Sequence, residues 1–317
     1  MSAEREVTGH DSANTAAYRG RFAPSPTGPL HFGSLVAAVA SHLQALVAGG
    51  DWLLRIEDID PPREIEGAAE QIIESLAAHG FQWSGSVLYQ RHNQQNFDAI
   101  SRSLLDSDLA FACSCSRAQI RKTARMGAVG PIYPGTCRDK IDLKHGPHSI
   151  RVRTMHEHIS FEDALQGQID CELDEDIGDF IIRRKDGLIA YSLAGALDDH
   201  AQGITEVVRG MDLLHFTPAQ IFLQRLLGLR TPDYMHVPIA VTEAGDKLSK
   251  QTGARPLDNR QPANNLFRCL EFLRQAPPPA LRTEPVEAIW SWARSHWEPR
   301  KLANCRKIPI QHINVFY

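Results

Sequence analysis

The chain has 317 residues, of which 43% are hydrophobic and 23% are charged, and its formal net charge is −4. This composition is ordinary for a globular protein and allows a large core with two domains. It excludes a membrane-spanning helix, because no apolar run approaches the ~20 residues that a bilayer requires. Six cysteines in a chain of this length argue against a disulfide framework. Residues 1–17 are polar and resemble no targeting signal, so we expect a disordered tail on a cytoplasmic protein.

The first ordered segment predicts a strand, a tight loop and a helix. Residues 18–23 read as a strand, and three prolines then stiffen the loop because proline fixes φ. Apolar residues at helical spacing predict a helix that begins near Gly33. The N-terminus of such a helix offers free N–H groups to an anion, and His31 lies where an imidazole could donate to a phosphate oxygen. The alternative is an ordinary turn in which His31 only packs.

The alternation continues after this helix. Residues 52–56 read as a buried strand, and residues 69–77 as a helix that ends at Gly80. This order predicts a parallel sheet with helices on its faces. Ligands of such sheets bind at the carboxyl ends of the strands, where Arg21 and Glu57 fall.

The remainder of the chain predicts a second half of the same sheet. We expect strands at 179–184, 204–208 and 236–241 and a helix at 213–227. The intervening irregular region contains cysteines and is typical of an insertion. The predicted division is a catalytic domain in two halves at 18–110 and 189–240, an insertion at 111–188, and a short helical C-terminal region at 241–317.

A lysine loop follows the last predicted strand. Lys247 and Lys250 lie three residues apart between Gly245 and Gly253. Alone, such a loop is more often a solvated turn. Combined with the loop before Gly33, it predicts the second half of a clamp for a triphosphate, in an enzyme that uses ATP to activate a carboxylic acid.

These two segments resemble the signature motifs of class I aminoacyl-tRNA synthetases. Residues 31–34 are similar to the histidine signature and residues 247–251 to the lysine signature. Further segments resemble the glutamate branch of that class: residues 21–28, 55–63, 198–200 and 208–214. The resemblance extends from about Tyr18 to about Thr252 and is nearest to a shortened glutamate paralogue, the glutamyl-queuosine tRNA(Asp) synthetases. It implies an α/β fold with a Rossmann-like, parallel-sheet catalytic domain.

The resemblance also implies the reaction. The carboxylate of L-glutamate would attack the α-phosphorus of ATP without tRNA, to give glutamyl-adenylate. Such catalysis consists of positioning and charge stabilisation, with Mg²⁺ bridging the phosphates. The expected catalytic residues are His31, Lys247 and Lys250. The expected ATP-binding residues are His31, Gly33, Ser34, Lys247, Ser249 and Lys250.

Glutamate requires cations for its side-chain carboxylate and an anion for its ammonium. Arg21 and Arg209 are the candidate cations, because a guanidinium binds a carboxylate with two hydrogen bonds. By resemblance, Glu57 binds the ammonium and Tyr191 supplies a hydroxyl. The alternatives are that Glu57 is a surface carboxylate paired with an arginine and that Tyr191 is a core aromatic. The complete expected glutamate site is Arg21, Phe22, Ala23, Pro24, Ser25, Glu57, Tyr191 and Arg209.

The insertion contains a candidate metal site. Cys113, Cys115 and Cys137 could bind zinc together with Tyr133, because structural zinc takes four ligands and favours thiolates. The resemblance supports this set, although the gap between Cys115 and Tyr133 is longer than expected. His145 or His148 could replace Tyr133, and three free thiols are the alternative to a metal.

The acceptor is the remaining question. The stretch after Lys250 is too short for a large anticodon-reading domain, so the resemblance implies transfer of glutamate to queuosine in the anticodon loop of tRNA-Asp. We expect the protein to be a monomer. A truncated enzyme that charges a tRNA 3′ end and a non-catalytic nucleotide- or RNA-binding paralogue are the alternatives. A net charge of −4 is unusual for an RNA-binding protein. Two basic clusters could contact RNA or be solvated faces: Arg117, Arg121, Lys122 and Arg125, and Arg294, Arg300, Lys301, Arg306 and Lys307.

Overall fold

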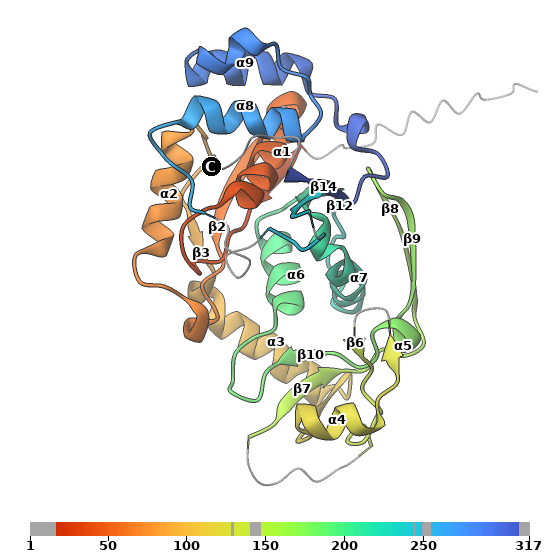
Figure 1. The fold of residues 1–317 in the computed structure, drawn as a ribbon. Coiled ribbons are helices and arrows are strands. Elements are labelled where there is room, and N and C mark those ends of the chain that lie inside the picture. The colour runs from red at the N-terminus through yellow and green to blue at the C-terminus, as the bar shows by residue number, and fades with distance from the viewer. Residues whose placement is uncertain (1–16, 128–129, 140–146, 244, 249–254, 311–317) are drawn as a thin grey trace, which may run out of the picture.

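The computed structural model describes residues 17–127, 130–139, 147–243, 245–248 and 255–310 (Figure 1). Ser249, Lys250 and His145 lie outside these residues, as does the expected tail apart from its last residue. None of the described helices is long and apolar enough to cross a bilayer.

The first half of the sheet has the predicted strand–loop–helix order. Its elements are β1 (Arg19–Phe22), α1 (Phe32–Ala48), β2 (Asp51–Ile56), η1 (Pro61–Arg63), α2 (Ala68–Ala78), β3 (Leu88–Tyr89), η2 (Gln90–Asn93) and α3 (Gln94–Asp106). β1, β2 and β3 are parallel. α1 is buried on most of its faces and ends at Gly49, whose φ of 65° favours glycine.

The second half supplies two further parallel strands. Its elements are α6 (Tyr191–Ala201), β11 (Glu206–Gly210), η3 (Met211–Phe216), α7 (Thr217–Leu226), β12 (Asp233–Val237) and β13 (Ile239–Val241). β11 pairs with β12, and Thr205 N donates to Arg19 O at 2.9 Å, so the start of β11 lies beside β1. The carboxyl ends of β1 and β11 therefore meet at one edge.

Three of these elements differ from the sequence prediction. The helix expected at 213–227 begins as the 3₁₀ segment η3, and α7 has Pro218 in its first turn, where the missing N–H costs nothing. The strand expected at 236–241 is two strands, because Pro238 between them cannot donate to a ladder. The strand expected at 204–208 continues to Gly210, which places Arg209 inside β11.

The region between the halves forms an antiparallel unit and a hairpin. Its elements are β4 (Ala110–Cys113), α4 (Arg117–Thr123), β5 (Met126–Gly127), β6 (Gly130–Pro131), β7 (Ser149–Val152), β8 (His158–Asp163), β9 (Gly167–Glu172), α5 (Leu173–Asp176) and β10 (Ile181–Arg183). β4, β7 and β10 form one antiparallel sheet. The β8–β9 hairpin instead joins β12, with Asp163 opposite Tyr234, so it extends the sheet of the second half.

The C-terminal region covers α1 at the end of the molecule opposite α4 (Figure 1). Its elements are α8 (Pro262–Phe272), η5 (Pro279–Thr283), α9 (Val286–His296), η6 (Pro299–Leu302) and β14 (Lys307–Pro309). β14 pairs with β13, directly before the lysine loop. Trp290 packs against His42, and Trp297 is buried, so both tryptophans belong to the core. The first basic cluster lies on α4 and just after it, whereas the second is spread over α9, η6 and the start of β14.

Candidate active site

Two neighbouring cavities lie at the edge where β1 and β11 end. The first has a volume of about 180 Å³, and its wall includes Arg21, Phe22, Ala23, His31, Gly33, Ser34, Tyr191, Arg209, Asp212 and Lys247. The second, of about 500 Å³, is lined by Pro24, Ser25, Thr27 and Gly28 and shares Phe22, His31, Ser34 and Lys247 with the first. His31 and Lys247, distant in sequence, therefore share a wall.

Arg21 lies in this wall with its charge already compensated. Its Nε donates to Oδ1 of Asp199 at 3.0 Å, and both side chains are buried. Asp199 also accepts from Arg55 Nη1 at 2.8 Å. Burial alone would raise the pKa of Asp199, but the two guanidinium groups outweigh it and lower that pKa to about 2. Asp199 is therefore an ionised carboxylate shared by two arginines.

Arg209 is buried to the same degree but has only neutral partners. Its Nε donates to His236 Nε2 at 3.0 Å, its Nη1 to Tyr191 Oη at 3.1 Å, and its Nη2 to Thr217 Oγ1 at 2.8 Å. Within the described part of the chain, no carboxylate forms an ion pair with it. An uncompensated buried cation costs several kcal/mol. Of the two guanidinium groups in the cavity wall, Arg209 is the one that lacks an anion.

Glu57 and Tyr191 contact different arginines of the site, Arg55 and Arg209 respectively. Glu57 is buried, and its Oε1 is 3.3 Å from Arg55 Nη2. The alternative prediction is therefore correct that Glu57 pairs with an arginine, but wrong that it is a surface carboxylate. It does not line either cavity. Tyr191 opens α6 and lines the first cavity. Burial raises the pKa of its phenol, so the hydroxyl keeps its proton. Its ring also packs edge-on against Phe216.

His31 forms the N-cap of α1. Its Nδ1 accepts from the backbone N–H of Ser34 at 3.3 Å, and Ser34 Oγ lies 3.3 Å from its Nε2. A Cβ at Gly33 would lie 3.2 Å from the imidazole, so glycine gives the ring its room. Lys247 reaches the same wall, where its Nζ lies 2.6 Å from Asp212 Oδ2.

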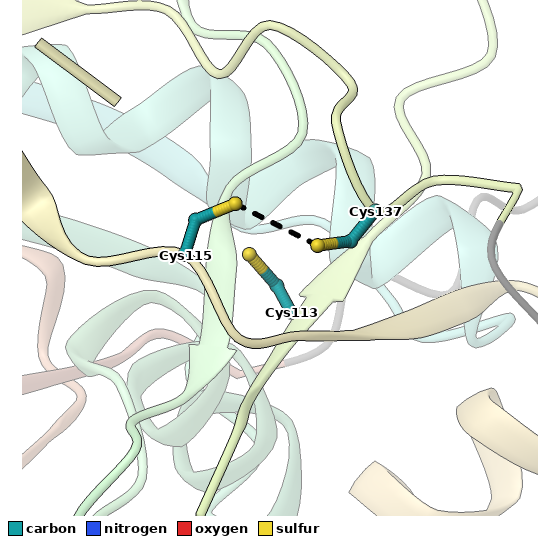
Figure 2. Close-up of side chains that lie close together, drawn as sticks. All are labelled: Cys113, Cys115 and Cys137. Atoms are coloured by element: carbon teal, nitrogen blue, oxygen red, sulfur yellow. Dashed lines mark hydrogen bonds between the residues drawn. The ribbon is translucent and has the colours of Figure 1, made fainter. Parts of the chain in front are cut away.

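The three cysteines predicted to bind a metal lie together (Figure 2). Their sulfur atoms are within 4.8 Å of one another, and Cys115 Sγ is 3.6 Å from Cys137 Sγ. Tyr133 Oη is 3.3 Å from Cys113 Sγ and accepts from the Cys137 N–H at 2.8 Å. His148 is not part of this cluster of the described residues. Four zinc–sulfur bonds of ~2.3 Å in a tetrahedron place sulfurs about 3.8 Å apart, so the cluster has the right size for zinc.

Sequence reasoning missed the residues that hold the two arginines and Lys247 in place. Asp199 and Asp212 lie inside recognised motifs, and that position was the only signal available for them. Thr217, His236 and Asp163 lie outside every recognised motif. Their roles depend on strand pairing that brings distant segments together.

The chain is similar to known proteins along most of its length. The family model for the catalytic domain of class I tRNA synthetases (E and Q) matches residues 17–266. The chain is 48% identical over 282 residues to the glutamyl-Q tRNA(Asp) synthetase of Dechloromonas aromatica, covering 88% of this chain and 94% of that protein. It is 46% identical over 299 residues to that of Pseudomonas aeruginosa, covering 94% of this chain and 100% of that protein. The fold matches a glutamate-tRNA synthetase from Elizabethkingia anophelis with a TM-score of 0.75 and 21% identity, over 92% of this chain and 68% of that one.

Proposed function

Because this chain belongs to the glutamyl-Q tRNA(Asp) synthetase family of class I tRNA synthetases, a family of glutamate-activating ligases, we propose that it forms glutamyl-adenylate without tRNA and transfers the glutamyl group to queuosine in tRNA-Asp. Glutamate, ATP and a tRNA follow from the family. The order of the steps and the identity of the acceptor are the proposed part.

The observation that carries the glutamate site is the uncompensated charge of Arg209. Its three neutral partners occupy three of the five guanidinium N–H groups and leave two for a carboxylate. We assign these two donors to the side-chain carboxylate of glutamate. Glutamine would bring no charge to the same place, so a buried cation selects the acid over the amide.

The other end of the amino acid faces Arg21 and Tyr191. Arg21 lines the first cavity, and the Tyr191 hydroxyl, whose oxygen accepts from Arg209, has a proton that it can donate. Phe22 and Ala23 line the same cavity, whereas Pro24 and Ser25 line the neighbouring one. We propose that the Glu57 carboxylate, which lies outside the two cavity walls, interacts electrostatically with the ammonium group of bound glutamate.

ATP occupies the second cavity in this proposal. An oxygen of the α-carboxylate of glutamate forms a bond to the α-phosphorus of ATP. The bond from that phosphorus to the bridging oxygen breaks, and pyrophosphate leaves. His31, the N-terminus of α1 and Lys247 meet the developing negative charge on the shared wall. Ser249 and Lys250, which follow Lys247 in the sequence but lie outside the described residues, are proposed to bind ATP as well. Mg²⁺, when bound, would neutralise further phosphate charge.

A structural zinc site fits the cysteine cluster. Cys113, Cys115 and Cys137 would supply three thiolates, with Tyr133 as the fourth ligand. Burial raises the pKa of Cys137, but hydrogen bonds from Tyr133, the Ser114 backbone and Cys115 outweigh it and lower that pKa to about 6, which favours a thiolate. Burial raises the pKa values of Cys115 and Tyr133, so the metal itself would have to displace their protons. The ion would tie the end of β4 to the segment that follows β6.

Acceptor mapping tests the complete proposal. The enzyme is given labelled glutamate, ATP and three forms of tRNA-Asp: the queuosine-containing tRNA, the same tRNA without its 3′-terminal adenosine, and the tRNA with guanosine at the modified position. We expect equal labelling of the first two and none of the third. Labelling that requires the terminal adenosine would identify a 3′-charging enzyme. Absence of glutamate-dependent pyrophosphate exchange would refute adenylate formation.

A further inference from the structure

Arg209 is held by a buried chain of two residues that no motif identifies. The pairing of β11 with β12 puts Arg209 opposite His236, whose Nε2 accepts the Arg209 Nε–H at 3.0 Å. The other ring nitrogen, Nδ1, lies 2.5 Å from Asp163 Oδ2. His236 and Asp163 are both almost completely buried. The chain therefore runs from the cavity wall through β12 to the end of β8.

Asp163 is fixed as a hydrogen-bond acceptor. Its carboxylate accepts from the backbone N–H groups of Leu165, Gln166 and His236, at 3.0 to 3.2 Å. Although burial alone would raise its pKa, these donors and the imidazole hold that pKa below its usual value. An ionised carboxylate can only accept, so the proton of the imidazole must reside on Nδ1 of His236.

This tautomer determines what faces Arg209. With the proton on Nδ1, Nε2 presents a lone pair, which accepts the Arg209 Nε–H and lies 3.3 Å from Thr217 Oγ1. Thr217 in turn accepts from Arg209 Nη2. Burial lowers the pKa of His236 to about 4, so the ring is neutral near pH 7. The imidazole thus orients the guanidinium without neutralising its charge.

We propose that His236, held in one tautomer by Asp163, is the positioning residue that fixes the Arg209 guanidinium for the side-chain carboxylate of glutamate. The inference rests on the proposed role of Arg209. A carboxylate in place of His236 would pair with Arg209 and compete with the substrate, whereas a neutral acceptor leaves the cation available. Specificity for an acidic side chain then depends on a residue that does not touch the substrate.

The test compares four enzymes by glutamate-dependent ATP–pyrophosphate exchange without tRNA: the wild type, His236→Leu, His236→Gln and His79→Gln. His236→Leu removes the acceptor and leaves the Arg209 Nε–H buried without a partner. His236→Gln keeps an acceptor oxygen near the position of Nε2. His79 is a matched control, because it is also fully buried and hydrogen-bonded but packs against Asn265, away from both cavities. Thermal unfolding of each variant reports structural damage.

We expect His236→Leu to raise the KM for glutamate at least tenfold and to leave the KM for ATP within twofold, because small misplacements of a binding group are costly. His236→Gln should recover most of the loss, and His79→Gln should lower the melting temperature without changing either KM. Equal rises in both KM values for His236→Leu, or an unchanged KM for glutamate, would overturn the positioning role of His236 and leave the proposed function standing. A wild-type enzyme without glutamate-dependent exchange would overturn the proposed function and the inference with it.

The tautomer has a spectroscopic signature of its own. In protein labelled with ¹⁵N-histidine at pH 7.5, Nε2 of His236 should resonate as the unprotonated nitrogen and Nδ1 as the protonated one. The signal is assigned by its loss in His236→Gln. The opposite tautomer would contradict the proposed direction of the Arg209 hydrogen bond.

Discussion

Lys247 Nζ lies 2.6 Å from Oδ2 of Asp212, and both side chains line the first cavity. The lysine is half exposed, so this ion pair contributes at most about 1 kcal/mol to stability. Its position in the wall shared with the second cavity gives it a different role. Asp212 keeps the ammonium group next to the place where we propose that the phosphates bind.

Lys247→Ala should therefore slow pyrophosphate exchange about 100-fold or more and change the melting temperature little. The reason is that a donor to charge developing in the transition state is worth about 3–4 kcal/mol. Lys301→Ala is the matched control, because Lys301 forms a similar exposed pair with Glu298 on η6. If the exchange rate of Lys247→Ala stays within twofold of that of Lys301→Ala, Lys247 has no role in adenylate formation.

Arg209→Gln should raise the KM for glutamate roughly 10- to 100-fold and leave the KM for ATP within about twofold, because hydrogen bonds to charged groups contribute about 1.5–3 kcal/mol. Exchange kinetics with each substrate varied in turn measure the two values. The exposed Arg260, paired with Asp258, provides the control Arg260→Gln. Parallel changes in both KM values would be inconsistent with a carboxylate-binding role for Arg209.

The local chemistry of residues 18–48 made the first half of the site predictable. Prolines, glycine and helical periodicity specify the strand, the loop and the helix within a short stretch: β1 lies within one residue of its expected bounds, and α1 begins at Phe32, next to the expected start. Pro238 also signals the break between β12 and β13, but the apolar run on both sides of this proline predicts a single strand at 236–241.

The charge state of the site could not be predicted in the same way. Arg21 and Arg209 are equivalent in sequence reasoning, since each lies near the carboxyl end of a predicted strand. Only the fold shows that Asp199, 178 positions away, compensates Arg21, whereas Arg209 meets a neutral histidine. Such pairings depend on register between distant strands and helices, which a local pattern does not contain.

Zinc content tests the cysteine cluster directly. Purified wild-type protein should contain about one zinc per chain by elemental mass spectrometry, and Cys113→Ser and Cys137→Ser should contain almost none. Cys269→Ser is the control, because Cys269 is buried outside the cluster. Chelation should lower the melting temperature of the wild type and leave the zinc-free variants unchanged. Equal zinc contents in Cys113→Ser and Cys269→Ser would show that the cysteine cluster is not the zinc site.

Tyr133→Phe separates the fourth ligand from the other three. The substitution keeps the ring, which packs against the Arg151 guanidinium, and removes only the hydroxyl. If the phenolate ligates, the variant should lose zinc to a chelator at a concentration that the wild type tolerates. Zinc retention equal to that of the wild type would show that another group completes the site.

Asp199→Asn should change how stability depends on acidity. Burial raises the pKa of Asp199, but the stronger effect of Arg21 and Arg55 lowers it from 3.8 to about 2. A lowered folded-state pKa stabilises the fold fully above the unfolded-state value, and this contribution is lost as pH falls from about 4 toward 2. The contribution of the lowered Asp199 pKa to the free energy of unfolding above pH 4 amounts to about 2 kcal/mol.

The variant should also be less stable at pH 7, by about 3–5 kcal/mol, because two buried arginines lose their shared carboxylate. Melting temperatures from pH 6 to pH 2.5 measure both effects. Wild type and the control Asp106→Asn, at an exposed position on α3, should lose stability steeply below pH 4, and Asp199→Asn should show a shallower decline. Parallel curves for all three proteins would mean that Asp199 is not the ionised partner of Arg21.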